Sequence, residues 1–303
     1  MRKACDVYEK CPTYETDSFV LRLVRMEDAE DLLDCYGDKL AVERMNADFC
    51  TSNFYFTTLD EMRDCLQFWL NEYQNGAYVR FALIYKLSNK VVGTVEIFGG
   101  KYGVLRIDLA SEYEQNSFIE EITALAVSDF IYDFHIEKLV VKAEHTPERL
   151  DIFKKYAFTK AKTFRPNLGY YEYSNKGIAY CGLACCLCSE NLNCSGCKNK
   201  GCGEHANCKN FNCCQEKKIN GCWECSDFPC TGTMLDKKRL RAFADFVRTQ
   251  GEKELVSHLM RNNVRGISYH YPGQLLGDYD KGKTEEEIKN IIINGFVERE
   301  TKK

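Results

Sequence analysis

Short stretches in the first half of the chain alternate apolar and polar residues, a pattern typical of half-buried strands. Phe19, Leu21 and Leu23 form one face of the first such stretch. The alternation returns further along, and the Ser88-Asn89 pair predicts a turn between two of the strands. A later apolar run predicts a buried strand, and one more strand is expected within 167–176. The other predicted strands span 19–23, 81–85, 91–98, 104–109 and 139–143.

Apolar residues at helical spacing separate these strands. Ala29, Leu32 and Tyr36 predict one helix. Thr58 followed by Glu61 is a capping box, in which each side chain bonds the other residue's backbone N–H, so a second helix is expected to begin there. Its apolar stripe consists of Met62, Leu66, Trp69 and Tyr73, and further helices are expected over 118–126 and 150–156. This order of strands and helices predicts a mixed α/β fold with a central sheet and flanking helices.

The cysteines mark a domain boundary. Five of them precede Tyr180, whereas thirteen lie between Cys181 and Cys230. A step of this size in composition predicts a first domain over 1–176 and a small cysteine-rich domain with C-terminal helices over 177–303.

Three pairs of closely spaced cysteines in this second domain predict a metal site. The pairs are Cys185/Cys188, Cys194/Cys197 and Cys222/Cys225. Each pair can turn both sulfur atoms toward one ion, and four thiolates complete a structural zinc site. The stretch between Cys186 and Lys218 holds few aliphatic residues, so metal binding is expected to supply its folding free energy. The candidate ligands of two or three ions are Cys181, Cys185, Cys188, Cys194, Cys197, Cys202, His205, Cys208, Cys213, Cys222, Cys225 and Cys230.

Alternatives to zinc stay open at this point. An iron–sulfur cluster also takes thiolate ligands, although the spacing here differs from that of ferredoxins. Ordinary buried or redox-active cysteines are the third interpretation. Cys186 and Cys214 each follow another cysteine directly and are either additional ligands or bystanders.

Composition and charge restrict the class of protein. The formal net charge is −4 and no long basic face stands out, so nucleic acid is not the expected partner. No segment approaches the roughly 18 apolar residues of a membrane helix, and the N-terminal residues lack the apolar core of a signal peptide. A cytoplasmic location is expected, where thiols are kept reduced and are available to a metal.

The order of elements, together with the segments 136–144 (IEKLVVKAE) and 146–158 (TPERLDIFKKYAF), resembles the GNAT family of N-acetyltransferases over about residues 19–173. Members of this family bind acetyl-CoA where two parallel strands part, and they pass the acetyl group directly to an amine. The resemblance therefore implies an acetyl-CoA-dependent enzyme with a small-molecule or peptide amine as its acceptor.

The resemblance also assigns residues to the coenzyme. The family's pyrophosphate loop usually reads Arg-Gly-x-Gly-x-Ala, and neither glycine is present at the matching positions of this chain. Phe153 stands where many members carry a tyrosine general acid, and a phenylalanine cannot donate a proton. The implied coenzyme-binding residues are Leu109, Glu114, Gln115, Asn116, Ser117, Phe118, Ile119, Thr146 and Phe153.

Two carboxylates are candidates for the general base that removes a proton from the amine. Glu96 and Asp108 each lie late in a predicted strand, near the expected cleft. The alternative interpretation is that both are solvated strand residues without a catalytic role.

The cysteine-rich segment resembles a second family. The pattern Y-C-G-L-x-C-x-x-C at 180–188, with C-x-x-C at 194–197 and C-x-x-C-S-D-F-P-C at 222–230, is similar to a widespread bacterial and archaeal domain of unassigned function. This resemblance implies metal binding but no reaction. Two helices are expected after it, with apolar stripes at Leu240, Phe243, Phe246 and Val247 and at Leu255, Leu259 and Met260.

A literal P-loop pattern at 277–284 is set aside. Asp278 and Asp280 would face the phosphates, and few residues follow the pattern in this sequence. Thr284 and Glu287 instead predict a capping box that begins a helix over 285–293.

Two functions from different classes follow from the sequence. The first is an acetyl-CoA-dependent N-acetyltransferase with a C-terminal structural zinc module. The second is a non-catalytic binding or regulatory protein, in which the same fold has lost its coenzyme and the zinc module recruits a partner. The order of elements favours the first, and the altered loop at 114–119 favours the second.

Overall fold

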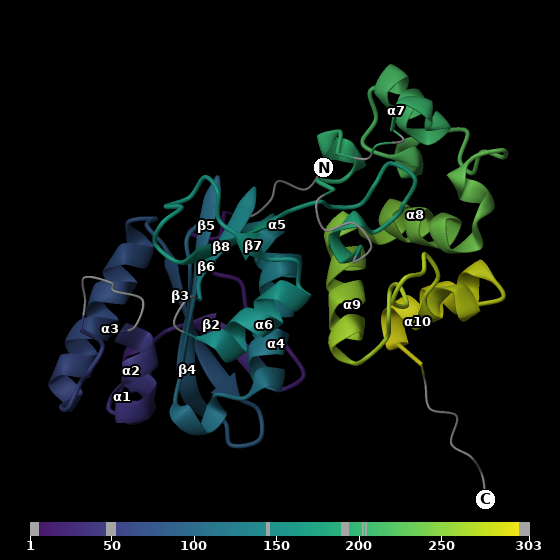
Figure 1. Ribbon diagram of the computed structural model, residues 1–303. Helices are drawn as coiled ribbons and strands as arrows, with labels where there is room; N and C mark the ends of the chain where they lie inside the picture. Colours follow the sequence, from purple (N-terminus) through teal and green to yellow (C-terminus); the bar gives the residue numbers. More distant parts are fainter. Residues whose placement is uncertain are drawn as a thin grey trace, which may run out of the picture. The chain divides into compact units, whose positions relative to one another are not determined.

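The computed structural model describes residues 6–46, 53–143, 146–188, 194–201, 203 and 205–296. The chain divides into two compact units, Met1–Ser174 and Asn175–Lys303 (Figure 1). Each unit has its own core and is described on its own.

The first unit is built on an eight-stranded sheet in the order β1-β2-β3-β4-β5-β6-β8-β7. Neighbouring strands are antiparallel except for β5 and β6, which run parallel. Together with the flanking helices, this sheet confirms the predicted mixed α/β class. The strands are β1 (Tyr14–Glu15), β2 (Phe19–Leu23), β3 (Val79–Tyr85), β4 (Lys90–Ile97), β5 (Tyr102–Leu109), β6 (Lys138–Lys142), β7 (Thr159–Lys160) and β8 (Tyr170–Ser174).

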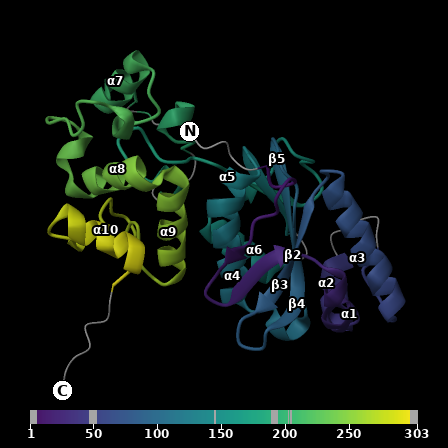
Figure 2. The same cartoon turned by 180° about the vertical axis from the view of Figure 1, so that it is seen from behind.

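Two groups of helices cover the two faces of this sheet, as Figures 1 and 2 show from opposite sides. On one face lie α1 (Ala29–Tyr36), α2 (Lys39–Asn46) and α3 (Leu59–Gln74). On the other lie α4 (Asn116–Leu125), which continues through a π-helical turn (Ala126–Phe130) into α5 (Ile131–Asp133), and α6 (Pro147–Lys155). The helix α2 was not predicted from the sequence.

The start of α3 follows the predicted capping box. The backbone N–H of Glu61 donates to the Thr58 hydroxyl at 3.3 Å, and the Thr58 N–H donates to the Glu61 carboxylate at 3.0 Å. Met62, Leu66 and Trp69 then pack against Ala82 and Ile84 of β3 in one apolar core, so the helix lies flat on the sheet.

Alternate residues of β3 serve the two faces. Ala82 and Ile84 join the core under α1–α3, whereas Phe81 stacks on Phe130 at 5.5 Å on the other face. Arg80 points to the same face as Ala82 and is only 2% exposed. The core of this face therefore contains a buried guanidinium group, whose partners form the site described below.

The second unit contains little sheet and four longer helices, α7 (Lys209–Lys217), α8 (Lys238–Gln250), α9 (Glu252–Val264) and α10 (Glu285–Asn294). Both predicted apolar stripes on α8 and α9 are buried, as expected. Short 3-10 turns carry the cysteine-rich segment, and they span Cys185–Leu187, Cys197–Asn199, His205–Asn207, Cys222–Glu224 and Met234–Asp236.

The segment that matches the P-loop pattern forms a 3-10 turn, Asp278–Lys281, followed by α10. The Glu287 N–H donates to the Thr284 hydroxyl at 3.1 Å, which confirms the predicted helix start. Asp278 accepts hydrogen bonds from the Ser268 N–H and the Tyr271 hydroxyl, so this acid supports the turn.

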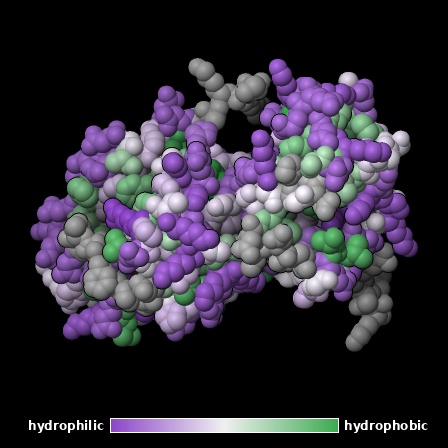
Figure 3. Space-filling model, turned by 45° about the horizontal axis from the view of Figure 1, so that its top comes forward, coloured by the Kyte–Doolittle hydropathy of each residue, from purple (hydrophilic) through white to green (hydrophobic). Residues whose placement is uncertain are grey.

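Hydrophilic residues dominate the face of the molecule shown in Figure 3, and hydrophobic ones lie there in small separate patches. Among the described residues, no helix is both long and apolar enough to cross a membrane.

Candidate active site

The parallel strands β5 and β6 part halfway along β5. Their pairing runs from Tyr102 opposite Lys138 to Leu105 opposite Val141 and then stops. On its other side, β5 stays paired with β4 as far as Leu109. The last four residues of β5 therefore have a neighbouring strand on one side only, which leaves main-chain groups on the β6 side available to other partners.

A cavity of about 920 Å³ lies beside this opening. Its walls include the end of β5, the end of β6 and residues of α6, and it extends to aromatic side chains of the face covered by α3. Its titratable lining residues are Arg44, Glu61, Asp64, Cys65, Tyr78, Arg80, Glu96, Arg106, Asp108, Lys142, Arg149, Arg165 and Tyr170. A cavity of this size is sufficient for a cofactor or a drug-sized ligand.

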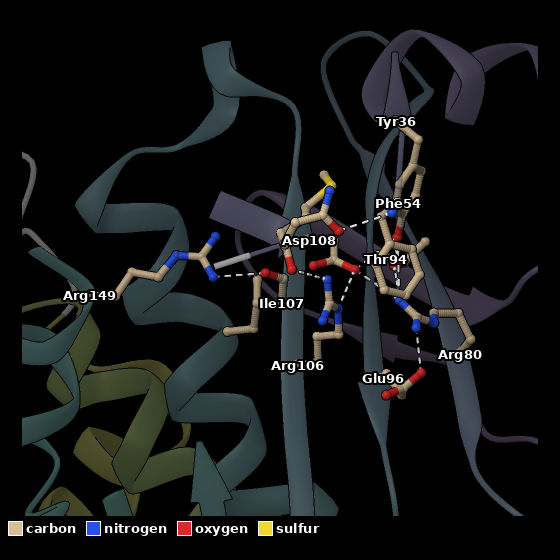
Figure 4. Close-up of polar contacts among 11 residues, drawn as sticks. Tyr36, Phe54, Arg80, Thr94, Glu96, Arg106, Ile107, Asp108 and Arg149 are labelled. Atoms are coloured by element: carbon tan, nitrogen blue, oxygen red, sulfur yellow. Dashed lines mark hydrogen bonds and ion pairs between the residues drawn. The ribbon is translucent and has the colours of Figure 1, made fainter. Parts of the chain in front are cut away.

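A buried ionic network forms one wall of the cavity (Figure 4). Asp108 accepts hydrogen bonds at its Oδ2 atom from Arg80 at 2.9 Å, from Arg106 at 2.8 Å and from the Tyr36 hydroxyl at 3.0 Å. Arg80 also pairs with Glu96 and donates to Thr94 at 3.1 Å. Each charged group of the network has direct partners, and these contacts offset the cost of its burial.

The network holds Asp108 in its ionised form. Burial by itself would raise the pKa of Asp108, but the charges of Arg106 and Arg80 outweigh burial and lower the pKa below its ordinary value. Asp108 is 2% exposed, and a proton taken up there would weaken both ion pairs. This environment suits an anchor for the two arginines better than the predicted role of a general base.

Glu96 is the better placed of the two predicted bases. Its side chain is 12% exposed, lines the cavity and forms an ion pair with Arg80. Glu96 lies opposite Arg80 on β3 and opposite Arg106 on β5, so the strand register places it between two arginines.

An aromatic ring packs against the guanidinium group of each of the two arginines, Arg80 and Arg106. The Arg80 guanidinium lies 4.3 Å from the centre of the Trp69 ring, and that of Arg106 lies 4.3 Å from the centre of the Phe54 ring. Cation–π contacts of this length add to the ion pairs. Sequence analysis missed both arginines, although a charged residue within the apolar stretch Val79–Tyr85 was a usable signal.

A thiol in the cavity is unsuited to covalent transfer. Cys65 lines the cavity, and burial raises the pKa of its thiol to about 12. Because the thiolate is the nucleophilic form, a raised pKa disfavours a nucleophilic role for Cys65.

A residue of the predicted pyrophosphate loop, Glu114, forms an ion pair with Arg149 of α6. Glu114 accepts from Arg149 Nε at 2.5 Å and from Arg149 Nη2 at 2.7 Å. Arg149 Nη1 donates to the main-chain carbonyl of Ile107, in the part of β5 that has left β6 (Figure 4). Arg149 thus links the loop to the opening between the strands.

The other predicted coenzyme residues fall into two groups. Thr146 and Phe153 line the cavity. Leu109 and Ile119 are each 1% exposed and belong to the core, while Phe118 packs on Phe19 with ring centres 5.0 Å apart. Gln115 precedes α4, and Asn116 and Ser117 are exposed in its first turn.

The cysteines of the second unit gather in two places. Cys181 and Cys185 are buried with Leu240, and Cys197 packs against them. In the other place, the Sγ atoms of Cys214 and Cys222 lie 3.8 Å apart, Asn210 donates to Cys222 Sγ at 3.2 Å, and Lys217 donates to Cys225 Sγ at 3.1 Å.

Within the described part of the chain, no three ligand-type side chains come close enough to hold a metal ion. The 3.8 Å between Cys214 Sγ and Cys222 Sγ allows one thiol to donate a hydrogen bond to the other. Two thiolates at about 2.3 Å from one zinc ion would lie at a similar distance of about 3.8 Å. Cys214 was left as a possible bystander in the sequence. Of the predicted ligands, Cys202 and the side chain of His205 lie outside the described residues, and Cys188, Cys194, Cys208, Cys213 and Cys230 are partly exposed.

Comparisons with known proteins give matches only among solved structures. No family model and no curated protein matches the chain. A putative ribosomal-protein-serine acetyltransferase from Vibrio cholerae is 11% identical with a TM-score of 0.43, over 54% of this chain and 98% of its own. A GNAT-family acetyltransferase from Bacillus anthracis is 12% identical with a TM-score of 0.42, over 54% of this chain and 99% of its own.

A third match is a ribosomal α-N-protein acetyltransferase in complex with coenzyme A. It is 12% identical with a TM-score of 0.44, over 54% of this chain and 98% of its own. These three similar structures bear the names of acetyltransferases, and each match covers 54% of this chain.

Proposed function

We propose that the first unit is an acetyl-CoA-dependent N-acetyltransferase that acts on a small-molecule or peptide amine. The observation that carries this proposal is the parting of β5 and β6 beside a cavity with an acidic side chain in its wall. Main-chain groups left open on β5 suit a ligand that is itself a chain of amides, as the pantetheine arm of coenzyme A is. The proposed reaction, transfer of the acetyl group to an amine, follows from the resemblance of the sequence to the GNAT family.

Glu96 is assigned the role of general base in this proposal. Acetyl transfer forms a bond between the amine nitrogen and the acetyl carbon, breaks the thioester carbon–sulfur bond and releases one proton from the amine. Glu96 accepts that proton, directly or through a water molecule, because it lines the cavity and is partly exposed. Phe153 has no proton to give, so the released thiolate takes one from water.

Asp108 is assigned a positioning role. Its carboxylate fixes Arg106 and Arg80, and Arg80 in turn orients Glu96 through their ion pair. A base held in one orientation favours proton transfer because the reacting atoms start close to the geometry they need.

A titration of the full chain with acetyl-CoA and with CoA tests this function. Thermal stability is expected to rise with either coenzyme, as it does for any ligand of the folded state. Release of free thiol is then followed with a panel of amines that includes polyamines, peptides with free N-termini and lysine derivatives. Absence of any shift at millimolar coenzyme would remove the enzyme from consideration.

One observation favours the second candidate, a binding or regulatory protein without coenzyme. Arg149 bonds the Ile107 carbonyl across the opening and pairs with Glu114, so protein groups already occupy part of this region. If the titration gives no binding, this interpretation replaces the first.

We propose further that the second unit is a structural zinc module that holds two or three ions. The support is the sequence, with its three C-x-x-C pairs, and the 3.8 Å between the Sγ atoms of Cys214 and Cys222, a distance compatible with two ligands of one ion. The proposed ligands are the predicted set with Cys214 added, and they work in a reducing compartment such as the cytoplasm.

Elemental analysis of the purified protein separates the metals. Zinc without iron supports the proposal, and iron with acid-labile sulfide would assign a cluster instead. Protein that is folded and free of both metals would leave only buried or redox-active cysteines.

A further inference from the structure

An unusual ion pair stands at the start of α4. Glu114 lies two residues before this helix and takes two short hydrogen bonds from Arg149 of α6. A second guanidinium group, that of Arg44 on α2, approaches the same carboxylate, with 3.6 Å between Arg44 Nε and Glu114 Oε2. One carboxylate thus faces two arginines that come from opposite faces of the sheet.

Arg44 is only partly satisfied by this arrangement. Its Nε and Nη2 atoms are buried and have no hydrogen-bond partner among the described residues. A buried guanidinium N–H without a partner is costly, so the site is incomplete without another acceptor. Arg44 and Arg149 both line the cavity, whereas Glu114 is not among its lining residues.

The charge of the cavity wall points to the kind of acceptor that is missing. Six of its lining residues are cationic and four are acidic. Asp108 and Glu96 are already paired with Arg80 and Arg106. Of the other cationic lining residues, Arg149 reaches the opening through the Ile107 carbonyl, and Arg44 shares the Glu114 carboxylate with it. Guanidinium groups bind phosphate oxygens in the same two-pronged way as they bind a carboxylate.

We propose that Arg44 and Arg149 bind the pyrophosphate of the coenzyme, and that Glu114 occupies them as an internal competing anion until the coenzyme displaces it. The proposal rests on the proposed acetyltransferase function and names a device of this chain within it. Side-chain guanidinium groups here take over the part that main-chain N–H groups play in a glycine-containing loop. Glu114 then lowers affinity for the coenzyme, because each binding event must first break its ion pairs.

The test compares Glu114→Gln with Glu120→Gln in the full chain. Glu120 of α4 is a matched control, since it also pairs with a cation of α6 (Lys155) and is 18% exposed, as Glu114 is. Neither Glu120 nor Lys155 lines the cavity. Both variants lose one negative charge, so a general effect of net charge appears equally in both.

Calorimetric titrations with CoA and with pantetheine provide the readout. Glu114→Gln is expected to bind CoA about tenfold more tightly than the unchanged chain, because the competing charge-assisted hydrogen bonds are gone. Its affinity for pantetheine, which has no pyrophosphate, stays the same. Glu120→Gln is expected to change neither affinity by more than about twofold.

Arg44→Gln provides a second, independent variant. Its guanidinium makes no hydrogen bond through Nε or Nη2, and its ion pair with Glu114 is long, at 3.6 Å. We expect about tenfold weaker CoA binding and unchanged pantetheine binding.

The outcomes separate this inference from the proposed function. If the unchanged chain binds CoA and Glu114→Gln binds it equally or more weakly, Glu114 merely supports Arg149 and the inference is wrong, while the proposed function stands. If the unchanged chain binds no CoA but Glu114→Gln does, the inference is upheld. If none of the variants binds CoA or pantetheine, both fail.

Discussion

The two units solve the problem of buried polar atoms in opposite ways. In the first unit, the carboxylate of Asp108 is fully surrounded by its own partners, Arg80, Arg106 and Tyr36. In the described part of the second unit, thiols come together in pairs, such as Cys214 and Cys222, but no three ligand-type side chains form a complete metal site. The buried charges of the first unit thus have protein partners, whereas the second unit depends, on our proposal, on a bound metal ion.

The difference also concerns what surrounds the polar atoms. Trp69 and Phe54 cover the guanidinium groups of the first unit, within a large apolar core. Around Cys181 and Cys185 the corresponding core is small and includes Leu240. Apolar burial therefore stabilises the first site directly, and little of that stabilisation is available to the second.

Removal of metal should have the largest effect. A strong chelator at neutral pH is expected to abolish the thermal transition of the second unit and leave that of the first unchanged, since structural zinc contributes on the order of 10 kcal/mol or more. Differential scanning calorimetry of the full chain measures both transitions. Survival of both in the chelator would contradict the proposed metal module.

Disruption of the buried network should come next. Asp108→Asn leaves Arg80 and Arg106 without their common anion, and we expect a loss of about 3–5 kcal/mol in the unfolding free energy of the first unit. Urea titration measures this loss. Lys86→Met is the control, because its ion pair with Glu15 is exposed and should contribute no more than about 1 kcal/mol.

The same carboxylate predicts a pH dependence. The pKa of Asp108 is lower in the folded protein than its ordinary value of about 3.9. Its contribution is therefore complete above that ordinary value and is lost as the pH falls toward the lower folded pKa. Stability curves below pH 5 should decline less steeply in Asp108→Asn than in the unchanged chain. Parallel curves would show that Asp108 does not have a lowered pKa.

Loss of the proposed base should reduce catalysis more than folding. Glu96→Gln keeps the shape of the side chain and its ability to accept a hydrogen bond from Arg80, but it cannot take up a proton. We expect kcat to fall about 100-fold with KM for acetyl-CoA nearly unchanged. Steady-state kinetics across pH decide the point, because a base also leaves an acidic limb in the pH profile that Glu96→Gln should lack.

Removal of a helix cap should give the smallest loss of stability, and the loss should be similar in the two units. Thr58→Ala at the start of α3 and Thr284→Ala at the start of α10 each remove one side-chain cap. Each is expected to cost about 1 kcal/mol. Calorimetry should show the first change in the transition of the first unit only and the second in that of the metal-bound second unit.

Much of the first unit was predictable because its strands and helices have regular apolar patterns. The helix α2 was missed because only Ala41 and Met45 are buried in it, which is too short a stripe to recognise. The contacts within the candidate site were harder to predict from the sequence. Glu96 and Asp108 were found as acids late in strands, but their arginine partners follow from the register between β3, β4 and β5.

Contacts over long sequence separations set the remaining limits. Glu114 and Arg149 are 35 residues apart, and nothing in either local sequence indicates that they meet. In the second unit, the spacing of the cysteines predicted pairs of thiols. The approach of Cys214 to Cys222 depends on the first turns after α7 and escaped the sequence analysis.

The open end of β5 is, in effect, a sheet edge inside a sheet. Exposed strand edges are templates on which other chains can add, which promotes aggregation. Here Arg149 of α6 already binds the Ile107 carbonyl at this edge, so the position is shielded from another strand without being closed by one. On our proposal, the coenzyme would take up the remaining peptide groups of this edge, so that ligand binding would also complete its protection.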